Sequence, residues 1–156
     1  MSAWGNILRI FILSMVPIIE LRGAIPWGVA LGMPWLETYI ICVIGNMIPV
    51  PFIMLFFRYI LSWMKGVKHL NKIALWIERK AGRGSEKIMK YASFGLMLFV
   101  AIPLPGTGAW TGAAAAALMN MRMRYAVPMI FLGVLIAGFI MTGVSYGFLG
   151  FLSFFA

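Results

Sequence analysis

The stretch VPIIELRGAIPWG, residues 16–28, places charge and helix-breaking residues between two apolar runs. A carboxylate at Glu20 and a guanidinium at Arg22 stand directly before Gly23. Charged side chains at membrane depth are costly unless they face protein or a water-filled cavity, so they mark sites of function. The stretch therefore predicts a functional break in a membrane helix.

The composition excludes a soluble domain. Of the 156 residues, 63% are hydrophobic and only 11% are charged, which lies outside the range of soluble globular proteins. Residues 38–57, 91–121 and 125–156 carry no charge, and each run can cross a hydrocarbon core about 30 Å thick. The sequence predicts an all-α integral membrane protein whose net charge of +9 faces lipid headgroups, with no nucleic-acid partner.

Basic residues concentrate in the middle of the chain. Eight of the thirteen Lys and Arg residues fall within residues 65–90, so the positive-inside rule predicts that this loop is cytoplasmic. Apolar residues recur in it at spacings of three and four, which predicts an amphipathic surface helix that ends at Gly82 and Gly84. This helix either senses lipids or a partner, or simply connects the halves and fixes topology.

The second half contains a break of its own. An apolar run from Ala92 meets PLPGTG at residues 103–108 and then resumes. Eleven helical residues rise about 16 Å, roughly half a bilayer core, so the segment forms a kinked span or a re-entrant hairpin. The positive-inside rule favours the hairpin, because it returns Arg122 and Arg124 to the side of the basic loop.

The first half follows the same plan. Arms of about residues 6–18 and 24–33 flank ELRG, and an apolar span at 35–61 leads into the basic loop. The two halves also share an aliphatic-Pro pair, a Gly-Ala pair and a Trp closely followed by Gly. The predicted fold is therefore two inverted repeats, each a re-entrant hairpin followed by a transmembrane helix, with repeat 1 at 1–62, the linker helix at 63–91 and repeat 2 at 92–156.

A third interruption, GNMIPVP at residues 45–51, lies inside the first span. Asn46 is expected to cap a broken helix there or to bond a carbonyl that Pro49 or Pro51 leaves free. The two readings of Asn46, helix-packing contact or pathway lining, stay open.

The two hairpin tips predict an anion site. Broken backbone survives in a bilayer only beside protein or a cavity, and the second arms begin near Ala24 and Ala109 with free N–H groups and a positive dipole end. The predicted anion-binding residues are Arg22, Gly23, Gly106, Thr107 and Gly108, with Arg122 and Arg124 at the cytoplasmic mouth. The predicted hairpin breaks or cavity walls are Pro17, Pro26, Asn46, Pro49, Pro103 and Pro105.

Glu20 has a separate predicted role. A carboxylate in a low-dielectric cleft can take up and release a proton, as proton-coupled transport requires. The alternative is a structural pair with Arg22, although side chains two positions apart on a helix point to different faces. Arg122 and Arg124 either meet headgroups or anchor topology, and Arg58 is expected to snorkel to the interface.

Enzyme signatures are absent from the sequence. It contains no HExxH, no G-x-S-x-G and no P-loop, and its one cysteine, Cys42, has no partner for a disulfide or a thiolate metal cluster. We expect no enzymatic activity, no metal and no cofactor.

Three motifs, PIIELRGAIPWGVALG, GNMIPVPFI and FVAIPLPGTGAWTGA, resemble the small multidrug export proteins of bacteria and archaea, and the resemblance extends over essentially the whole chain. It implies a multi-pass protein of the prokaryotic plasma membrane. More distantly, the paired hairpins resemble the DedA (VTT) superfamily, whose members are implicated in moving lipids between leaflets. By position, Glu20 and Arg22 match functional residues of its first hairpin and Arg122 or Arg124 the region after its second, but the second hairpin here has no acidic residue.

These resemblances imply a transporter. The first expectation is proton-coupled translocation of an anionic amphiphile such as a polyprenyl phosphate or a phospholipid. The alternatives are export of hydrophobic cations, with Glu20 binding the cation, and a membrane scaffold that binds a partner through residues 65–90. Membrane lipids are the expected partners, and two chains are expected to enclose the cavity as a homodimer because each has only two full spans.

Overall fold

The computed structural model describes residues 3–67, 70–73, 75–76, 86–104 and 106–155, and these residues form helices without any strand. The helices are α1 (Ala3–Met15), α2 (Glu20–Ala30), α3 (Trp35–Met47), α4 (Pro49–Gly66), α6 (Glu86–Ala101), α7 (Ala109–Leu118) and α8 (Met123–Phe155). The all-α prediction is confirmed for this part of the chain.

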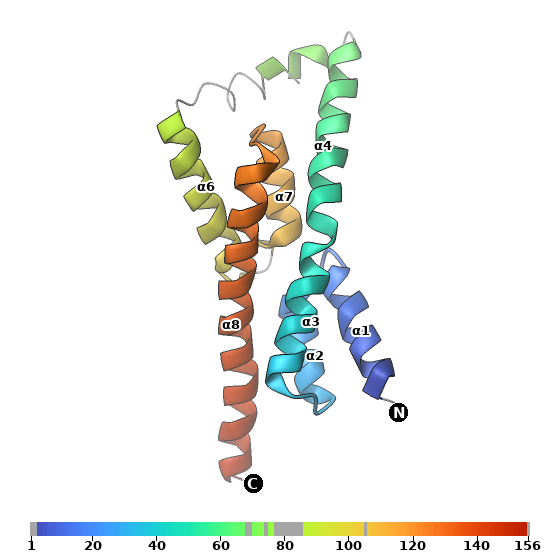
Figure 1. Ribbon diagram of the computed structural model, residues 1–156, viewed down its shortest axis with the longest axis vertical. Helices are drawn as coiled ribbons and strands as arrows, with labels where there is room; N and C mark the ends of the chain where they lie inside the picture. The colour runs from blue at the N-terminus through green and yellow to red at the C-terminus, as the bar shows by residue number, and fades with distance from the viewer. Residues whose placement is uncertain (1–2, 68–69, 74, 77–85, 105, 156) are drawn as a thin grey trace.

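Two helical hairpins approach each other turn to turn. Helices α1 and α2 pack together in the lower half of Figure 1, and α6 and α7 lie in its upper half. The first hairpin opens toward the lower end and the second toward the upper end, so their turns meet near the middle. Helix α8 runs past both hairpins, and α3 followed by α4 forms the second long element.

The first break lies earlier than the sequence suggests. We predict it around ELRG, but α2 already begins at Glu20. The backbone N–H of Glu20 donates to the carbonyl of Val16 (2.9 Å), and that of Gly23 donates to Ile19 (2.9 Å). The helical first turn therefore contains both charged residues, and the break occupies residues 16–19.

The second break is where the sequence predicts it. Helix α6 ends at Ala101 and α7 begins at Ala109, so PLPGTG joins them. Gly106 has a φ of +85°, a left-handed conformation that glycine adopts without steric cost. This glycine allows the chain to reverse between the two arms.

The two long elements have the length and composition of membrane spans. Residues Trp35–Gly66 and Met123–Gly147 are the two stretches in the described part of the chain that are long and apolar enough to cross a membrane. The first is interrupted at Ile48, between α3 and α4, as GNMIPVP predicts. Pro49 opens α4, where its missing N–H is not needed, so the interruption costs little backbone hydrogen bonding.

The helices extend into the predicted linker. The first span continues to Gly66 rather than ending near 61, and α6 begins at Glu86 rather than at 92. Residues 71–73 and 75–76 are helical. The remainder of the predicted amphipathic helix, including Gly82 and Gly84, lies outside the described residues.

The two halves end their hairpins in the same way. Helix α2 ends with Gly32 at a φ of +71°, and the N–H of Met33 donates to the carbonyl of Gly28 (3.0 Å). Helix α7 ends with Asn120 at a φ of +52°, and the N–H of Met121 donates to Ala116 (2.9 Å). Both are Schellman motifs, in which a left-handed residue closes the helix.

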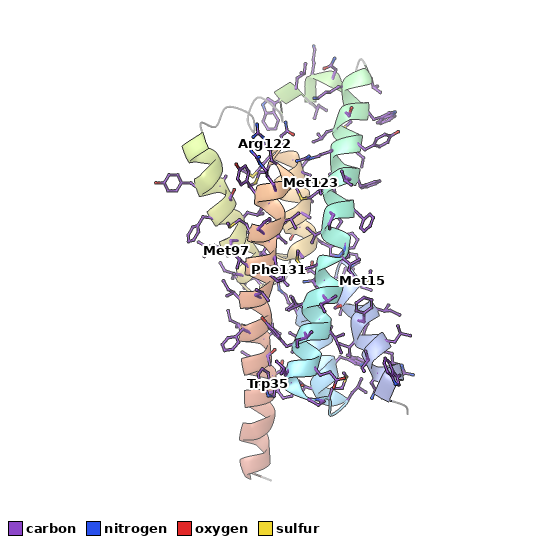
Figure 2. The ribbon with its side chains drawn as sticks, in the orientation of Figure 1. Met15, Trp35, Met97, Arg122, Met123 and Phe131 are labelled. Atoms are coloured by element: carbon purple, nitrogen blue, oxygen red, sulfur yellow. The ribbon has the colours of Figure 1, made fainter. Side chains whose placement is uncertain are left out.

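Matching glycines let each span approach its own hairpin. A Cβ on Gly45 of α3 would meet the side chain of Ser14 and the carbonyl of Phe11 in α1. A Cβ on Gly133 of α8 would lie 2.7 Å from both the Met97 carbonyl and Val100 Cβ in α6. Backbone contact this close fixes each hairpin against its span, and Figure 2 shows Met97 on α6 beside α8.

Candidate functional site

A cleft lies between the two hairpin turns. It has a volume of about 390 Å³, and its walls come from both breaks and from α8. The lining includes Pro17, Glu20 and Arg22 from the first hairpin and Pro103, Gly106 and Thr107 from the second. Residues about 85 positions apart along the chain (20 and 22 against 106 and 107) thus face one space.

Glu20 points from the first hairpin to the start of α7. Its side chain is only 5% exposed, and its Oε1 accepts a hydrogen bond of 3.1 Å from the backbone N–H of Trp110. Trp110 is the second residue of α7, where N–H groups lack helical partners and the helix dipole is positive. The carboxylate therefore compensates the broken end of the other hairpin.

Gly108 makes room for that carboxylate. A Cβ built on Gly108 would clash with the Glu20 carboxylate, lying 2.6 Å from its Cδ and 2.7 Å from Oε1. The φ of Gly108 is 176°, so extended backbone is not the reason for glycine here. The reason is the close approach of Glu20 to the backbone.

Arg22 binds the end of α6. Its Nη1 donates to the carbonyl of Leu104 (2.6 Å), and its Nη2 lies within hydrogen-bond distance of Ile102 O (3.0 Å), Thr107 Oγ1 (3.0 Å) and Val100 O (3.3 Å). These carbonyls follow the last turn of α6, where helical partners run out and the dipole is negative. The guanidinium supplies several donors to several acceptors, which an ammonium cannot match in geometry.

Trp110 makes the reciprocal contact to the first hairpin. Its indole Nε1 donates to the carbonyl of Met15, the last residue of α1, at 3.0 Å. Arg22 of the first hairpin thus donates to carbonyls at the end of α6. Trp110 of the second hairpin donates to the carbonyl at the end of α1. We call the contacts of Glu20, Arg22 and Trp110 across the two hairpins the interlock.

The interlock separates the two charges that the sequence placed together. Glu20 is directed to the N-terminus of α7 and Arg22 to the C-terminal carbonyls of α6. Their side chains diverge toward these two different partners. The N-terminus of α7, where the sequence predicts an anion site, is occupied in this structure by the protein's own carboxylate.

The remaining predicted residues of the breaks are found in three settings. Gly23 lines the cleft, and a Cβ there would lie 2.6 Å from Ile19 Cγ2. Pro26 lies inside α2 and does not line the cleft. Pro105 lies outside the described residues.

Asn46 makes neither of the bonds expected of it. The side chain is fully buried near the end of α3, and among the described residues neither its Oδ1 nor its Nδ2 has a hydrogen-bond partner. It therefore caps no helix end and bonds no carbonyl freed by Pro49. Neither residue lines the cleft.

Arg122 and Arg124 lie away from the cleft. Both are exposed and follow the C-terminal end of α7, one helix length from the interlock. Figure 2 shows Arg122 at the end of the molecule where α7 meets α8, whereas Met15 lies near the middle. The guanidinium carbon of Arg124 stands 4.8 Å from the centroid of the Tyr125 ring.

Most of the chain matches a known protein family. A family model described as "Putative small multi-drug export protein" matches residues 20–140. The chain belongs to this family. Curated proteins and solved structures yield no significant match. Membership in an export-protein family, together with the two long apolar helices, indicates that this is a membrane protein.

Two hydrogen bonds between the halves of this export-family protein were not predicted from the sequence. The sequence predicts that Arg58 of α4 snorkels to the interface, but it does not indicate the partner that the structure shows, the carbonyl of Met121. Tyr146 of α8 donates to the carbonyl of Met33 at 2.7 Å. A cation within an otherwise apolar helix was the available signal for Arg58, but its partner lies 63 residues away.

The described residues of this family member offer little for metal chemistry. No group of three or more His, Cys, Asp or Glu side chains occurs among them, and Cys42 is a buried free thiol. The polar groups that the described residues bring to the cleft are the Glu20 carboxylate, the Arg22 guanidinium, the hydroxyls of Thr107 and Thr111, and backbone dipoles.

Proposed function

We propose that this protein is a membrane transporter of amphiphilic molecules, and that the cleft between the hairpin turns is its substrate path. The observation that carries the proposal is the interlock. Glu20 and Arg22 of one hairpin bond to the two ends of the break in the other. A purely structural helix pair does not need two broken helices whose charged ends meet in one cleft.

The lengths of the hairpin arms support a re-entrant arrangement. Helix α7 has 10 residues and rises about 15 Å, which is half of a hydrocarbon core about 30 Å thick. The turns then lie near the midplane, and the two long elements cross the whole core. Broken backbone at that depth is stable only where protein or water receives it, as the interlock and the cleft do here.

The relation between the halves supports inverted repeats. Three pairs of equivalent residues differ by 88 in number. Met33 and Met121 close the hairpins, Gly45 and Gly133 pack against them, and Arg58 and Tyr146 donate to the carbonyls of Met121 and Met33. Repeats of opposite orientation that meet at broken helices are the plan of many secondary transporters, whose substrate sites lie at the repeat interface.

Release of Glu20 is the step that we assign to opening. In the structure the carboxylate holds the N-terminus of α7 and so keeps the two turns together. A proton on the carboxylate, or a cationic group of a substrate near it, weakens the attraction to the positive helix end. The turns then separate. The Glu20 carboxyl group then either holds the proton or binds the cationic group of the cargo.

A cationic amphiphile is the cargo that we favour. The family description refers to multidrug export, and Glu20 is the acidic residue that lines the cleft. Arg22 does not oppose a cation strongly, because carbonyl oxygens at the end of α6 surround its guanidinium.

An anionic amphiphile is the second candidate. The Nε of Arg22 is buried and has no hydrogen-bond partner among the described residues, and the N-terminus of α7 becomes available whenever Glu20 leaves it. A polyprenyl phosphate or phospholipid headgroup fits such donors, in line with the resemblance of the paired hairpins to the DedA superfamily.

Transport by proteoliposomes tests the proposal and separates the cargoes. Purified protein is reconstituted with a pH gradient, and uptake of tetraphenylphosphonium and translocation of fluorescent phosphatidylglycerol are measured in parallel. Glu20→Gln should abolish transport of the cation, and Arg22→Lys should abolish translocation of the lipid if the second candidate is correct. Glu37→Gln, at an exposed carboxylate in the first turn of α3, is the control.

Each result has a defined meaning. Transport of neither probe by the wild type, or full transport of both probes by Glu20→Gln, contradicts the proposal. Replacement of residues 65–90 by a neutral linker should leave transport intact, whereas a scaffold that acts through this loop would lose partner binding.

We also propose the arrangement in the cell. The basic loop faces the cytoplasm of a prokaryotic plasma membrane, and two chains together enclose the path. Labelling of Lys65→Cys from the cytoplasmic side alone, in a Cys42→Ala background, is the expected result. A monomer that transports at the wild-type rate would contradict the dimer.

A further inference from the structure

A second concave surface lies between the start of α3 and the far part of α8. It has a volume of about 330 Å³, and we call it the aromatic groove. Its walls are Trp35 and Tyr39 from α3 and Phe139, Thr142 and Tyr146 from α8. Met141 lines the cleft between the hairpins and Thr142 lines the groove, so adjacent residues of α8 serve separate sites.

The tyrosine rings of the groove are held in place by their hydroxyls. Tyr39 donates to the carbonyl of Leu135 (3.1 Å), and Tyr146 lies within hydrogen-bond distance of Met33 O (2.7 Å) and Thr38 Oγ1 (3.2 Å). These contacts join α3 to α8 across the groove. The rings therefore form fixed apolar walls whose polar ends are already bonded to the protein.

Two glycines leave the groove open along α8. Gly143 and Gly147 line it, and a Cβ on either would meet no atom within 4 Å. Among the described residues no helix packs against these positions, so the space in front of them belongs to the groove. A long, narrow apolar group can lie directly on the helix backbone there.

Thr142 provides one unsatisfied polar group in this apolar setting. Its side chain is 7% exposed, and its hydroxyl has no hydrogen-bond partner among the described residues. Buried hydroxyls are normally paired. The free hydroxyl in the wall of an open groove indicates a ligand with an uncharged acceptor oxygen.

The depth of the groove indicates which ligand. The first candidate span begins at Trp35, shortly after Gly32 closes the first hairpin, and Trp35 lines the groove. Figure 2 shows Trp35 beside the lower part of α8, far from Arg122 in the upper part of the molecule. The groove therefore lies at the membrane boundary, where aromatic belts gather and where the ester carbonyls of phospholipids stand above their acyl chains.

We propose that the aromatic groove binds a phospholipid, with one acyl chain along Gly143 and Gly147 and an ester carbonyl that accepts a hydrogen bond from Thr142. The described residues that line the groove carry no charge, so they offer no ionic partner to a charged headgroup or to a lipophilic cation. The site rests on the membrane placement given under the proposed function, but it does not depend on what the cleft transports.

Comparison of ester and ether lipids tests the role of Thr142. The protein is reconstituted with diester or diether phosphatidylglycerol, each with a photoreactive diazirine in the acyl or alkyl chain, and labelled peptides are quantified by mass spectrometry. One neutral hydrogen bond predicts a roughly two- to tenfold preference for the ester lipid at peptides of the groove. Thr142→Val should remove the preference and Thr142→Ser should retain it.

Filling the groove tests its occupancy. Gly143→Leu should lower labelling in the groove severalfold, because the new side chain projects into the space of the acyl chain and its Cβ meets no atom within 4 Å. Gly95→Leu is the matched control, since Gly95 of α6 is also a helical glycine whose added Cβ meets nothing within 4 Å. Labelling of peptides from the exposed face of α4 serves as the internal standard for membrane insertion.

The outcomes are distinct. Strong labelling of α4 with equal ester and ether labelling of the groove overturns the lipid site, whatever the transport assays give. Labelling of the groove that Gly143→Leu leaves unchanged also overturns it. Absence of labelling on both α4 and the groove contradicts the membrane placement itself, and with it the proposed function.

Discussion

The carboxylate of Glu20 accepts a hydrogen bond from the backbone N–H of Trp110 at 3.1 Å, although the two residues lie 90 positions apart in the chain. The indole N–H of Trp110 in turn donates to the carbonyl of Met15, the last residue before the first break. With Arg22 bound to the end of α6, both breaks are closed by side chains of the opposite hairpin. The two hairpins thus stabilise each other's interrupted backbone, and neither break is satisfied by its own segment alone.

Gly108→Ala should weaken the interlock. The added methyl group would occupy the position of the Glu20 carboxylate, and overpacking of this kind costs about 1–3 kcal/mol. The free energy of unfolding in mixed detergent and SDS micelles measures the loss. Gly95→Ala is the control, and it should raise stability by about 0.5–1 kcal/mol because alanine favours the helix. Equal stability of the wild type and Gly108→Ala would contradict the contact.

Arg22→Lys should destabilise the second break. An ammonium cannot reach the acceptors that the guanidinium fork contacts at Leu104, Ile102 and Thr107, so carbonyls at the end of α6 lose partners at a cost of about 1–3 kcal/mol. Hydrogen exchange of the α6 and α7 amides, read by mass spectrometry, should accelerate. The same change at exposed Arg122 should leave exchange at the break unaltered.

Trp110→Phe should loosen the first hairpin while the ring remains. The substitution removes the Nε1 donor to the carbonyl of Met15, and one such bond is worth about 0.5–1.5 kcal/mol. Hydrogen exchange of the backbone amides in residues 16–20, read by mass spectrometry, should become faster. Trp27→Phe, at a tryptophan that is 58% exposed, should behave like the wild type; equal effects of the two changes would argue against the bond.

Gly133→Ala should separate α6 from α8. A Cβ there meets the Met97 carbonyl and Val100, and backbone atoms cannot give way as a flexible side chain does. We expect a lower unfolding temperature, from a loss of about 1–3 kcal/mol. Gly143→Ala on the same helix has open space and should cause no loss, so a similar drop in both variants would refute the close approach.

Local features of the fold are readable from the sequence because they depend on nearby residues. Pro103 and Pro105 lack a backbone N–H and Gly106 favours a turn, so this segment interrupts a helix, and α7 begins at Ala109 as predicted. The interruption at Ile48 follows in the same way from Pro49. The first break lies earlier than predicted because the N–H groups of Glu20 and Gly23 already bond to Val16 and Ile19. Glu20 also adopts a φ of +48°, which no pattern of residue types indicates for a glutamate.

The site depends on contacts that no local pattern contains. Sequence reasoning identifies Glu20 and Arg22 as charged residues at a break, but it assigns Arg22 to an anion and Glu20 to a proton or to a pair with Arg22. Their observed partners, Trp110 and Leu104, become neighbours only when two distant hairpins meet turn to turn. For the same reason the sequence does not indicate the partners of Arg58 and Tyr146, since each binds a carbonyl of the opposite half.

The central claim is that transport requires the two hairpin turns to separate when Glu20 leaves α7. Spin labels at Ile18→Cys and Leu104→Cys, two exposed positions on the opposing turns, report their distance by double electron–electron resonance in a Cys42→Ala protein reconstituted in liposomes. The account predicts a short distance in the resting protein and a longer distance that becomes dominant in Glu20→Gln. A single short distance that is the same in both proteins would contradict it.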